Sequence, residues 1–551
     1  MSRSRRRMRQ ENLRDTSTVE SKGFPTLPPP SPRQQRARTA DGTYNDLKTP
    51  AMGSAGMRFG RNVELNQVIP ESGPALLTPS PRTVSLELLT RDAFKPATTI
   101  NLMAAAWIQF QLHDWMSHGH NEKENPIEIP LAPGDTWPER PMRIRRTGRD
   151  RSRPAVPVHP VPTFQNHETH WWDGSQIYGS DEATAKRVRA GHDGKLAIGP
   201  DRLLLLDAEG IEVTAVTGNW WVGLGLLHTL FTLEHNAICD RLQKAHPGWQ
   251  DDELYDHARL VNAAVMAKIH TVEWTPGIAN HRVVHAALNG NWKTIRGSRP
   301  DHHAAPYSIT EEFVAVYRMH PLIPDEFTFR SHQTGALLQA RTLENVLGAN
   351  SRQLMTQMPV EDILYSFGTS HPGAIVLHNF PKLFQRFERP NAPLIDLAAV
   401  DIMRDRERGV PRYNRFRRLI GMEPVKSFDE LTNNPTWAQE IRRVYENDLE
   451  RVDLMIGLFA EPLLPGFGFS ETAFHVFVLM ASRRLQSDRF FTSSYNEETY
   501  SKEGLQWIED ATMSNVLLRH YPALAPALAG VGNAFAPWRT MASPSARTAG
   551  V

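Results

Sequence analysis

Apolar residues recur every three or four positions along most of the 551-residue chain. This spacing is typical of helices that bury one face. Runs that alternate apolar and polar residues, which indicate strands, are scarce. The pattern therefore predicts a mainly α, single large helical domain with little β structure. The helical segments that it predicts are 98–117, 223–245, 252–274, 308–320, 360–367, 436–458 and 470–486.

Two segments interrupt this periodicity. Residues 1–55 are rich in Arg, Ser, Pro and Thr and include FPTLPPPSP, so we expect a disordered or loosely wrapped tail before a folded domain at 56–540. Residues 137–162 are rich in Pro and Arg and predict a long surface connection inside that domain. The five arginines among the first ten residues could contact nucleic acid or anionic lipid, although a short basic arm is more often simply solvated.

Composition and charge argue against several classes of protein. A net charge of +1 gives no global attraction to nucleic acid, so we expect no nucleic-acid partner. Cys239 is the only cysteine, which fits a reducing, cytoplasmic compartment. The sequence has neither a long apolar run nor an apolar signal core, so we expect no transmembrane segment. Peripheral membrane contact stays open, and we expect a monomer.

The segment FVAVYRMHPLIPDEF, residues 313–327, brings a phenol and an imidazole close together in sequence. Tyr317 and His320 are three residues apart, so they would share one face of a helix that Pro321 ends. A tyrosine beside a histidine that binds haem iron fits radical chemistry. A buried tyrosine next to a histidine at a helix C-terminus would give the same pattern.

The helical segment AAAWIQFQLHDW, residues 104–115, contains a second candidate pair. Gln109 and His113 are four residues apart and share one face, whereas Asp114 points about 100° away from that face. One helix could therefore serve two sites. A single histidine on a helix is more often a core or surface residue than a functional one, so this segment alone decides nothing.

The loop THWWDGSQIYGS, which begins at Thr169, has oxygen-bearing residues at alternating positions. In an extended loop these oxygens, including backbone carbonyls, would face one side, as a hard cation such as Ca²⁺ requires. A Gly-containing turn with a side-chain cap explains the pattern equally well. The candidate calcium ligands, completed by the aspartate of the preceding helix, are Asp114, Thr169, Trp171, Asp173 and Ser175.

Together these motifs resemble the animal-type haem peroxidase and cyclooxygenase superfamily over roughly residues 95–525. The stretch DLAAVDIMRDRERGVPRYNRFR, residues 396–417, is similar to a long signature of that superfamily. Within it, the sequence is most like the fatty-acid α-dioxygenases. The likeness rests on WIQFQLHDW, WWDGSQIYGS, AKIHTVEWT, VYRMHPLIPDE and ASRRLQSDRFFT. The resemblance implies a haem-peroxidase-like helical domain that binds haem b and Ca²⁺.

The resemblance also implies roles for the motif residues. His113 with Gln109 would handle peroxide on the distal side of the haem, and His320 would bind the iron on the proximal side. Tyr317 would carry the radical. Asn379 could hydrogen-bond to the proximal histidine as a supporting group.

The substrate carboxylate would be held by His270, Thr275 and an arginine near the C-terminus. Either Arg484 or Arg489 fits that arginine, and the pattern does not decide between them. The chemical need is plain, because an arginine fork with a hydroxyl anchors a carboxylate well.

Two departures from mammalian peroxidases concern haem attachment. Leu112 occupies the place of an Asp that is esterified to the haem there, and residues 213–233 contain no charged residue that could supply the second ester or the distal arginine. The haem should therefore be non-covalent.

The function implied is a haem-dependent fatty-acid α-dioxygenase activated by H2O2. A Tyr317 radical would remove a hydrogen from C2 of a fatty acid, and O2 would add to give a 2-hydroperoxy acid, which can lose CO2 to leave an aldehyde. One alternative is a haem peroxidase that oxidises small organic or halide substrates. Another is a haem-binding protein whose basic arm recruits a partner. A third is a non-haem metal site at His113, His118 and His120.

Overall fold

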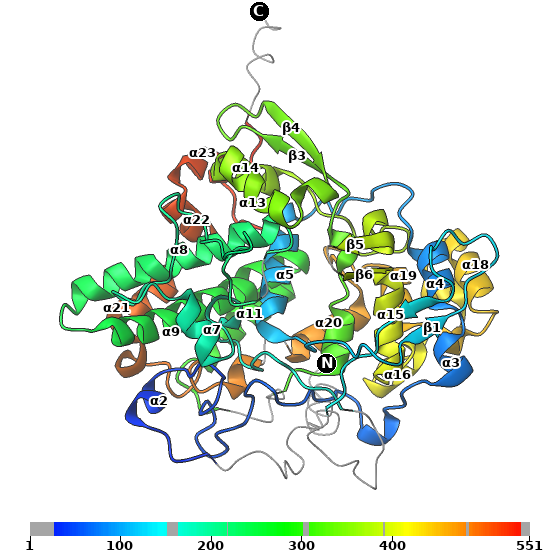
Figure 1. Ribbon diagram of the computed structural model, residues 1–551, viewed down its shortest axis with the longest axis horizontal. Coiled ribbons are helices and arrows are strands. Elements are labelled where there is room, and N and C mark those ends of the chain that lie inside the picture. The colour runs from blue at the N-terminus through cyan, green and yellow to red at the C-terminus, as the bar shows by residue number, and fades with distance from the viewer. Residues whose placement is uncertain are drawn as a thin grey trace, which may run out of the picture.

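The computed structural model describes residues 27–150, 163–216, 219–300, 308–389, 392–480 and 484–541. Helices dominate these ranges, as the sequence predicts (Figure 1). The helices are α2 (Pro32–Arg36), α3 (Gly73–Leu77), α4 (Pro81–Val84), α5 (Leu102–Trp115), α6 (Ser175–Tyr178), α7 (Glu182–Val188), α8 (Val222–Ala245), α9 (Asp251–Ile269), α10 (Thr275–Ile278), α11 (Arg282–Ile295), α12 (Glu311–Val316), α13 (Ala349–Gln357), α14 (Val360–Thr369), α15 (Leu397–Glu407), α16 (Tyr413–Leu419), α17 (Phe428–Leu431), α18 (Pro435–Val444), α19 (Leu454–Ala460), α20 (Glu471–Met480), α21 (Glu497–Asp510), α22 (Met513–His520) and α23 (Ala525–Leu528).

Strands are few and short. Within the described ranges they form three antiparallel pairs, which confirms the expectation of little β structure. The pairs are β1 (Ile127–Ile129) with β2 (Met142–Ile144), β3 (Glu326–Arg330) with β4 (Leu337–Thr342), and β5 (Phe387–Arg389) with β6 (Ala392–Ile395).

The centre of the fold is a group of packed helices. Helix α8 contacts both α5 and α9, and its first eleven residues, 222–232, are all buried because this stretch lacks charged side chains. Figure 1 shows α5 and α20 between two sets of helices. Helices α8 and α9 lie on one side, and α15, α16 and α18 lie on the other. Three of the predicted residues, Gln109, His113 and Asp114, lie on α5. No helix in the described chain has both the length and the apolar character needed to span a bilayer.

Two predicted helices differ in the structure. The segment 436–458 forms α18 and α19, separated by a turn in which Glu446 and Asn447 adopt positive φ angles of 52° and 59°. The segment 252–274 is helical as predicted, but its last turn, His270–Trp274, is a π-helix. Wider π turns interrupt helices and often lie at functional sites.

The Tyr317 helix is shorter than predicted. Helix α12 ends at Val316, and Tyr317 caps it with φ −93° and ψ 20°. His320 begins a separate 3-10 turn, His320–Leu322, so Pro321 lies in a first turn, where a missing N–H costs nothing. The expectation that Tyr317 and His320 share one helix face is therefore wrong, because the chain turns between them.

The N-terminal segment, residues 27–55, is folded instead of disordered. Arg38 is buried in an ion pair with Asp488, with 2.8 Å between its Nη2 and Oδ2. Arg489 donates to the backbone carbonyl oxygens of Gln34, Gln35 and Tyr44. The partners come from 450 residues away, so local composition does not reveal them. The part of the expected tail at 1–26 and the stretch 151–162 of the Pro/Arg connection lie outside the described residues.

We expect Arg489→Ala to lower the free energy of unfolding by about 2–3 kcal/mol, because one buried and two partly buried carbonyls lose their donor. The measurement is urea unfolding, combined with limited proteolysis of the N-terminal segment. Arg33→Ala is the control. Arg33 lies on the same segment and pairs with Asp252 and Asp256, but its side chain is 52% exposed. This change should cost less than about 1 kcal/mol. Equal losses in both variants would contradict the anchoring role of Arg489.

Candidate active site

Tyr317 is buried among aromatic rings at the end of α12. Its ring centre lies 4.6 Å from that of Phe313, 4.3 Å from that of Phe477 on α20, and 5.8 Å from that of Trp115 on α5. Burial raises the pKa of the phenol, with a smaller opposing effect of Arg484. The side chain therefore stays a protonated phenol at physiological pH.

Trp115, the last residue of α5, is the common neighbour of three predicted residues. Besides Tyr317, it contacts His270, with 5.2 Å between ring centres, and Arg484, whose guanidinium carbon is 5.4 Å from the ring centre. Trp172 lies against Trp115 and His270, at 5.0 Å from each. Segments far apart in the sequence thus meet around one indole.

His270 lies in the π turn that follows α9. Its Nδ1 accepts from Trp107 Nε1 at 3.2 Å, whereas its buried Nε2 has no hydrogen-bond partner among the described residues. Burial, with Arg484 nearby, lowers the pKa of His270 to about 3, so the ring is neutral. Thr275 is nearby but its hydroxyl is occupied, because it donates to the backbone carbonyl of His270 at 2.9 Å.

The structure separates the two candidate arginines. Arg484 is buried at Trp115 and donates from Nη2 to the carbonyl of His170 at 2.5 Å; its buried Nη1 has no partner in the described ranges. Burial lowers its pKa to about 10, which leaves it cationic at neutral pH. Arg489 is instead committed to the N-terminal segment, because each of its guanidinium nitrogens donates to a backbone carbonyl there. The alternative in which Arg489 binds substrate is therefore wrong.

His113 and Gln109 lie on α5, as predicted. Gln109 Oε1 accepts from Trp221 Nε1 at 2.6 Å. The buried Nδ1 of His113 has no partner in the described part of the chain, and burial lowers the pKa of this histidine to about 4. A neutral imidazole of this kind can accept a proton. His228, on α8, was not predicted: burial and then His113 lower its pKa to about 3. The sequence signal that could have identified His228 is a single histidine within the uncharged run 213–233.

His320 is held by a carboxylate that sequence reasoning missed. Its Nδ1 lies 2.8 Å from Asp401 Oδ2, and Arg318 Nη1 lies 3.0 Å from Asp401 Oδ1; both contacts are ion pairs by distance, without the angles of hydrogen bonds. Although burial acts in the opposite direction, Arg318 and His320 lower the pKa of Asp401 and keep it ionised. The imidazole is 29% exposed, and no described group bonds to its Nε2. Such a carboxylate orients a histidine whose other nitrogen binds a metal.

Asn379 does not support His320. Its Oδ1 accepts from Arg91 Nε at 3.0 Å and from the Lys95 backbone N–H at 3.1 Å. Its Nδ2 donates to the carbonyl oxygens of Lys95 and Ala374. The expected hydrogen bond to His320 is therefore wrong, because every hydrogen-bonding group of this amide has another partner.

A row of aromatic residues runs from His320 to Trp221, which is the hydrogen-bond partner of Gln109 on α5. The ring centres of His320 and Phe384 are 6.1 Å apart, and Phe384 lies 5.8 Å from Trp220. Trp220 in turn lies 5.9 Å from Trp221, which donates to Gln109. The row fixes the position of the His320 turn relative to α5.

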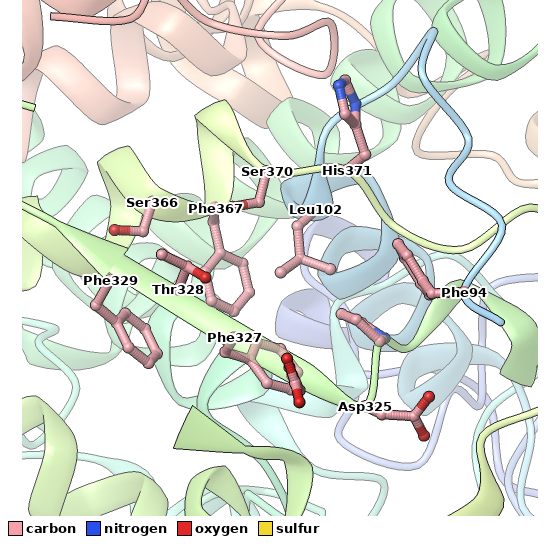
Figure 2. A pocket seen from close by; sticks show the side chains of 12 residues that line it. Phe94, Leu102, Asp325, Phe327, Thr328, Phe329, Ser366, Phe367, Ser370 and His371 are labelled. Carbon is pink, nitrogen blue, oxygen red and sulfur yellow. The ribbon is translucent and has the colours of Figure 1, made fainter. Parts of the chain in front are cut away.

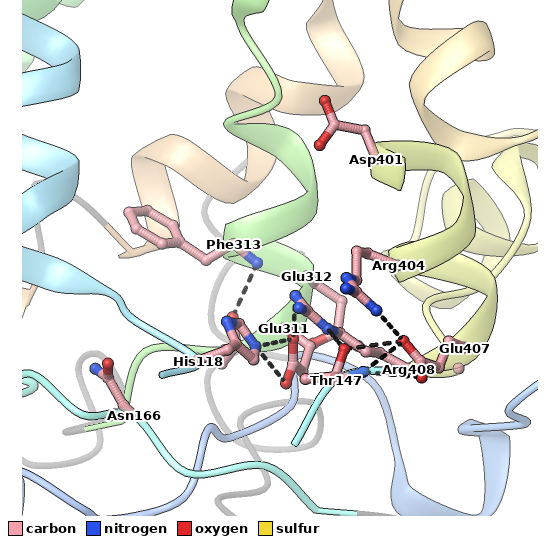
Figure 3. Close-up of polar contacts among 12 residues, drawn as sticks. His118, Thr147, Asn166, Glu311, Glu312, Phe313, Asp401, Arg404, Glu407 and Arg408 are labelled. Carbon is pink, nitrogen blue, oxygen red and sulfur yellow. Dashed lines mark hydrogen bonds and ion pairs between the residues drawn. The ribbon is translucent and has the colours of Figure 1, made fainter. Parts of the chain in front are cut away.

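A polar network at the N-terminal end of α12 connects this helix to the end of α15. Figure 3 shows Glu311, at the start of α12, between His118 and Arg408. Burial would raise the pKa of Glu311, but His118 and Arg408 lower it to about 2. His118 is thereby occupied, and no group of three His, Cys, Asp or Glu among the described residues could hold a metal ion. The structure therefore does not assemble a metal site from the three histidines 113, 118 and 120.

The predicted calcium residues do gather in one place. Asp114 Oδ1 accepts from the backbone N–H of Ser175 at 2.6 Å and from its hydroxyl at 3.0 Å. Asp173 Oδ1 accepts from Thr169 Oγ1 at 3.0 Å. Burial and then Asp173 raise the pKa of Asp114, whose Oδ2 has no described hydrogen-bond partner. Trp171 can contribute only its carbonyl, because its indole donates to Gly42. The loop is bent and not extended.

A separate cavity of about 400 Å³ lies beside β3 and α14 (Figure 2). Phe327 and Phe367 line it, and the same two rings pack against Trp221, at 6.0 and 5.7 Å. Asp325, also at the cavity, pairs with Arg91. Tyr317, His270 and Arg484 are not among the residues that line this cavity.

The animal haem peroxidase family matches residues 37–529. The chain belongs to this family. The match begins inside the segment that composition predicts to be a tail, in agreement with its folded state. Alpha-dioxygenase PIOX of Oryza sativa subsp. japonica is 37% identical over 92% of this chain and 87% of its own length, and alpha-dioxygenase 2 of Arabidopsis thaliana is 37% identical over 92% and 85%.

Solved structures agree with these sequence relatives. A tyrosine-to-phenylalanine variant of Oryza sativa fatty acid alpha-dioxygenase with palmitic acid superposes with a TM-score of 0.89 and 35% identity, covering 98% of this chain and 92% of that one. The Arabidopsis thaliana fatty acid alpha-dioxygenase also has a TM-score of 0.89 and 35% identity, over 97% and 88% of the two chains. Peroxidase A from Dictyostelium discoideum, at 20% identity and a TM-score of 0.72, shares the fold.

Family membership implies a haem enzyme, an oxidoreductase, and the two histidines fit a haem. The Nδ1 of His320 lies at a carboxylate while its Nε2 stays available, as an iron-binding imidazole requires. On the other side, His113 is a buried neutral base. These are properties of the donor groups, independent of the family match.

We expect Asp401→Ala to weaken haem binding about 10- to 100-fold, because His320 loses the carboxylate that orients it. Titration of haem into the haem-free protein, followed by Soret absorption, measures the change. Asp401→Asn keeps an acceptor near Nδ1 and should lose less.

Asn379→Ala is the contrasting variant. It should lower thermal stability while the haem affinity of the folded fraction stays unchanged, since Asn379 bonds only to Arg91, Lys95 and Ala374. A drop in haem affinity with Asn379→Ala but not with Asp401→Ala would reverse the assignment.

Proposed function

We propose that this protein is a haem-dependent fatty-acid α-dioxygenase that inserts O2 at C2 of a fatty acid. The observation behind the proposal is the meeting of Tyr317, Arg484 and His270 around Trp115. A phenol that can carry a radical thus lies beside a buried cation in an aromatic surrounding, which suits a substrate with a carboxylate and an apolar chain. Relatives named alpha-dioxygenase, 37% identical over most of both chains, support the same function.

The carboxylate is held by Arg484 and His270. Among the described residues, Arg484 Nη1 and His270 Nε2 have no hydrogen-bond partners, and an unsatisfied buried group costs about 1–3 kcal/mol. A carboxylate bound between them would remove that cost. Thr275 contributes if its hydroxyl leaves the His270 carbonyl. Anchoring the carboxylate fixes the neighbouring C2 close to the phenol of Tyr317.

Tyr317 carries the reaction from the protein side. Haem, when bound, supplies the one-electron oxidation of this tyrosine after reacting with peroxide. In that oxidation Tyr317 loses one electron and its phenolic proton, together one hydrogen atom, and the resulting phenoxyl radical takes a hydrogen atom from C2. O2 adds to the carbon radical, and the peroxyl group takes a hydrogen atom back from Tyr317. The product is a 2-hydroperoxy acid, which can lose CO2 to give an aldehyde one carbon shorter.

His113 prepares activation by H2O2. Because burial keeps its imidazole neutral, it can take the first proton of the peroxide and return it to the leaving oxygen. Gln109, fixed by Trp221, lies one helical turn away. We propose a non-covalent haem b, because Leu112 and the uncharged run 213–233 offer no carboxylate for an ester bond.

We also propose a calcium ion at the Asp114 loop. Burial and then the nearby Asp173 raise the pKa of Asp114, and a divalent cation would relieve the repulsion between the two carboxylates. Hydroxyl groups already lie at both carboxylates, and carboxylate, hydroxyl and carbonyl oxygens are the ligands that Ca²⁺ takes. The ligands would be Asp114, Thr169, the Trp171 carbonyl, Asp173 and Ser175.

Oxygen uptake by the haem-loaded protein on adding palmitate tests the function, with mass spectrometry of the product. We expect uptake and a 2-hydroperoxy acid or the C15 aldehyde. Tyr317→Phe should abolish uptake while retaining the Soret band, because only the hydrogen-atom carrier is lost. Retained oxygenation in this variant would refute the mechanism. Brisk peroxide-driven dye oxidation without uptake, across a range of fatty acids, would favour a general peroxidase instead.

Removal of calcium with EGTA should lower the melting temperature, and added Ca²⁺ should restore it. Calcium at a hundred times its Kd contributes about 2.7 kcal/mol. Metal analysis after gel filtration gives the stoichiometry. In Asp173→Asn the response to EGTA should disappear. Mg²⁺ is the control cation, because it prefers a smaller octahedral site and should restore less. An unchanged melting temperature together with no bound calcium would exclude the site.

A further inference from the structure

The indole N–H of Trp115 is one of several buried polar groups without a hydrogen-bond partner in the described chain. Trp115 is completely buried, and its Nε1 has no hydrogen-bond acceptor in the described chain. Buried tryptophans usually find a partner for this N–H, and leaving it unpaired costs about 1–3 kcal/mol. A ligand that accepts from this N–H would remove that cost.

The neighbouring tryptophans show that the unpaired N–H is particular to Trp115. Trp172 donates to Gln111 Oε1 at 2.9 Å, and Trp107 donates to His270 Nδ1 at 3.2 Å. Trp274, which stacks on His270 with 4.7 Å between ring centres, donates to the carbonyl of Ala104 at 2.9 Å. Within this described cluster of four indoles, only Trp115 lacks an acceptor.

The position of Trp115 indicates which ligand would accept from it. Its ring touches Tyr317, His270 and Arg484, the residues at which the proposed function places the carboxylate and C2. Two of these neighbours, Arg484 and His270, also have a nitrogen without a partner in the described ranges. All three groups can donate to an anion, and an anionic oxygen strengthens each hydrogen bond.

We propose that Trp115 is a further substrate-positioning residue, whose indole N–H donates to the carboxylate of the fatty acid together with Arg484 and His270. The inference rests on the proposed function and adds a determinant of specificity to it. A carboxylate offers several acceptor sites, so it can satisfy all three donors at once. An alcohol offers one uncharged oxygen and cannot. Trp115 therefore favours acids over alcohols of the same length.

The test measures ligand binding in haem-loaded Tyr317→Phe protein, which cannot turn over. Palmitate and hexadecan-1-ol are titrated into this parent and into the same protein with Trp115→Phe. The second change removes the N–H but keeps an aromatic ring. We expect palmitate affinity to fall about tenfold, as for one hydrogen bond to a charged group, and hexadecanol affinity to change less than about twofold.

Trp172→Phe in the same parent is the matched control. It removes an indole N–H from the same cluster, but that N–H is committed to Gln111, so the palmitate-to-hexadecanol ratio should stay at the parent value. Equal palmitate affinity in the parent and in Trp115→Phe would overturn the inference alone. A Trp115→Phe protein that loses haem but binds palmitate as the parent does would assign the N–H to the haem pocket and also overturn it.

Failure of the proposed function gives a different result, because the parent itself would then bind no palmitate. If Trp115→Phe does not fold, the inference can still be tested in the Tyr317→Phe protein, which keeps Trp115. Ultraviolet resonance Raman spectra report the strength of indole N–H hydrogen bonds. Adding palmitate to the Tyr317→Phe protein should shift one indole band toward stronger bonding, and adding hexadecanol should not. Bound palmitate without such a shift would contradict the inference.

Discussion

The burial of Arg484 beside Tyr317 is the constraint on which the rest of the site depends. A guanidinium can be buried only if negative charge surrounds it, and Asp114, Asp173 and Asp488 all stabilise its charged form. Those carboxylates in turn interact with Arg259 and Arg38. Acids and bases thus alternate from the N-terminal segment through Asp173 to Arg484.

This arrangement couples parts of the protein that have different tasks. Asp173 accepts from both Thr169 and Arg259, and Arg259 also donates to the carbonyl of Thr39 in the N-terminal segment. A cation at the calcium loop would compete with Arg259 for Asp173 and would change the field at Arg484. The site therefore responds to its surroundings through charge, over distances at which no direct contact with substrate exists.

Sequence reasoning singled out residues whose chemistry is distinctive and whose motifs are local, and their roles stay predictions. Tyr317 and His320 are examples, because both lie within the short segment 313–327. It failed where a partner comes from elsewhere in the chain. Asp401 lies within the segment 396–417, but nothing local in the sequence shows that it meets His320. Asn379 was placed wrongly for the same reason, and Arg489 is indistinguishable from Arg484 until the contacts of both are known.

Helix ends were a second source of error, because a period of 3.6 residues continues through short breaks. The pattern joined α18 to α19 and extended α12 past Tyr317, although positive φ angles and a 3-10 turn interrupt the backbone there. The side chains of tryptophans were a third source of error. Periodicity assigns Trp115 to the core, which is correct for its ring, but it says nothing about an N–H without an acceptor.

The contacts of the N-terminal segment have a consequence for how the protein is made. Arg38 pairs with Asp488, 450 residues further along the chain, and the adjacent Arg489 fixes the same segment. During synthesis the first part of the folded domain must therefore wait for almost the last part to leave the ribosome. Until then Asp114 and Asp173 have no Arg484 beside them. The chain would have hydrated acidic side chains for most of its translation, and the substrate site would form only in its final seconds.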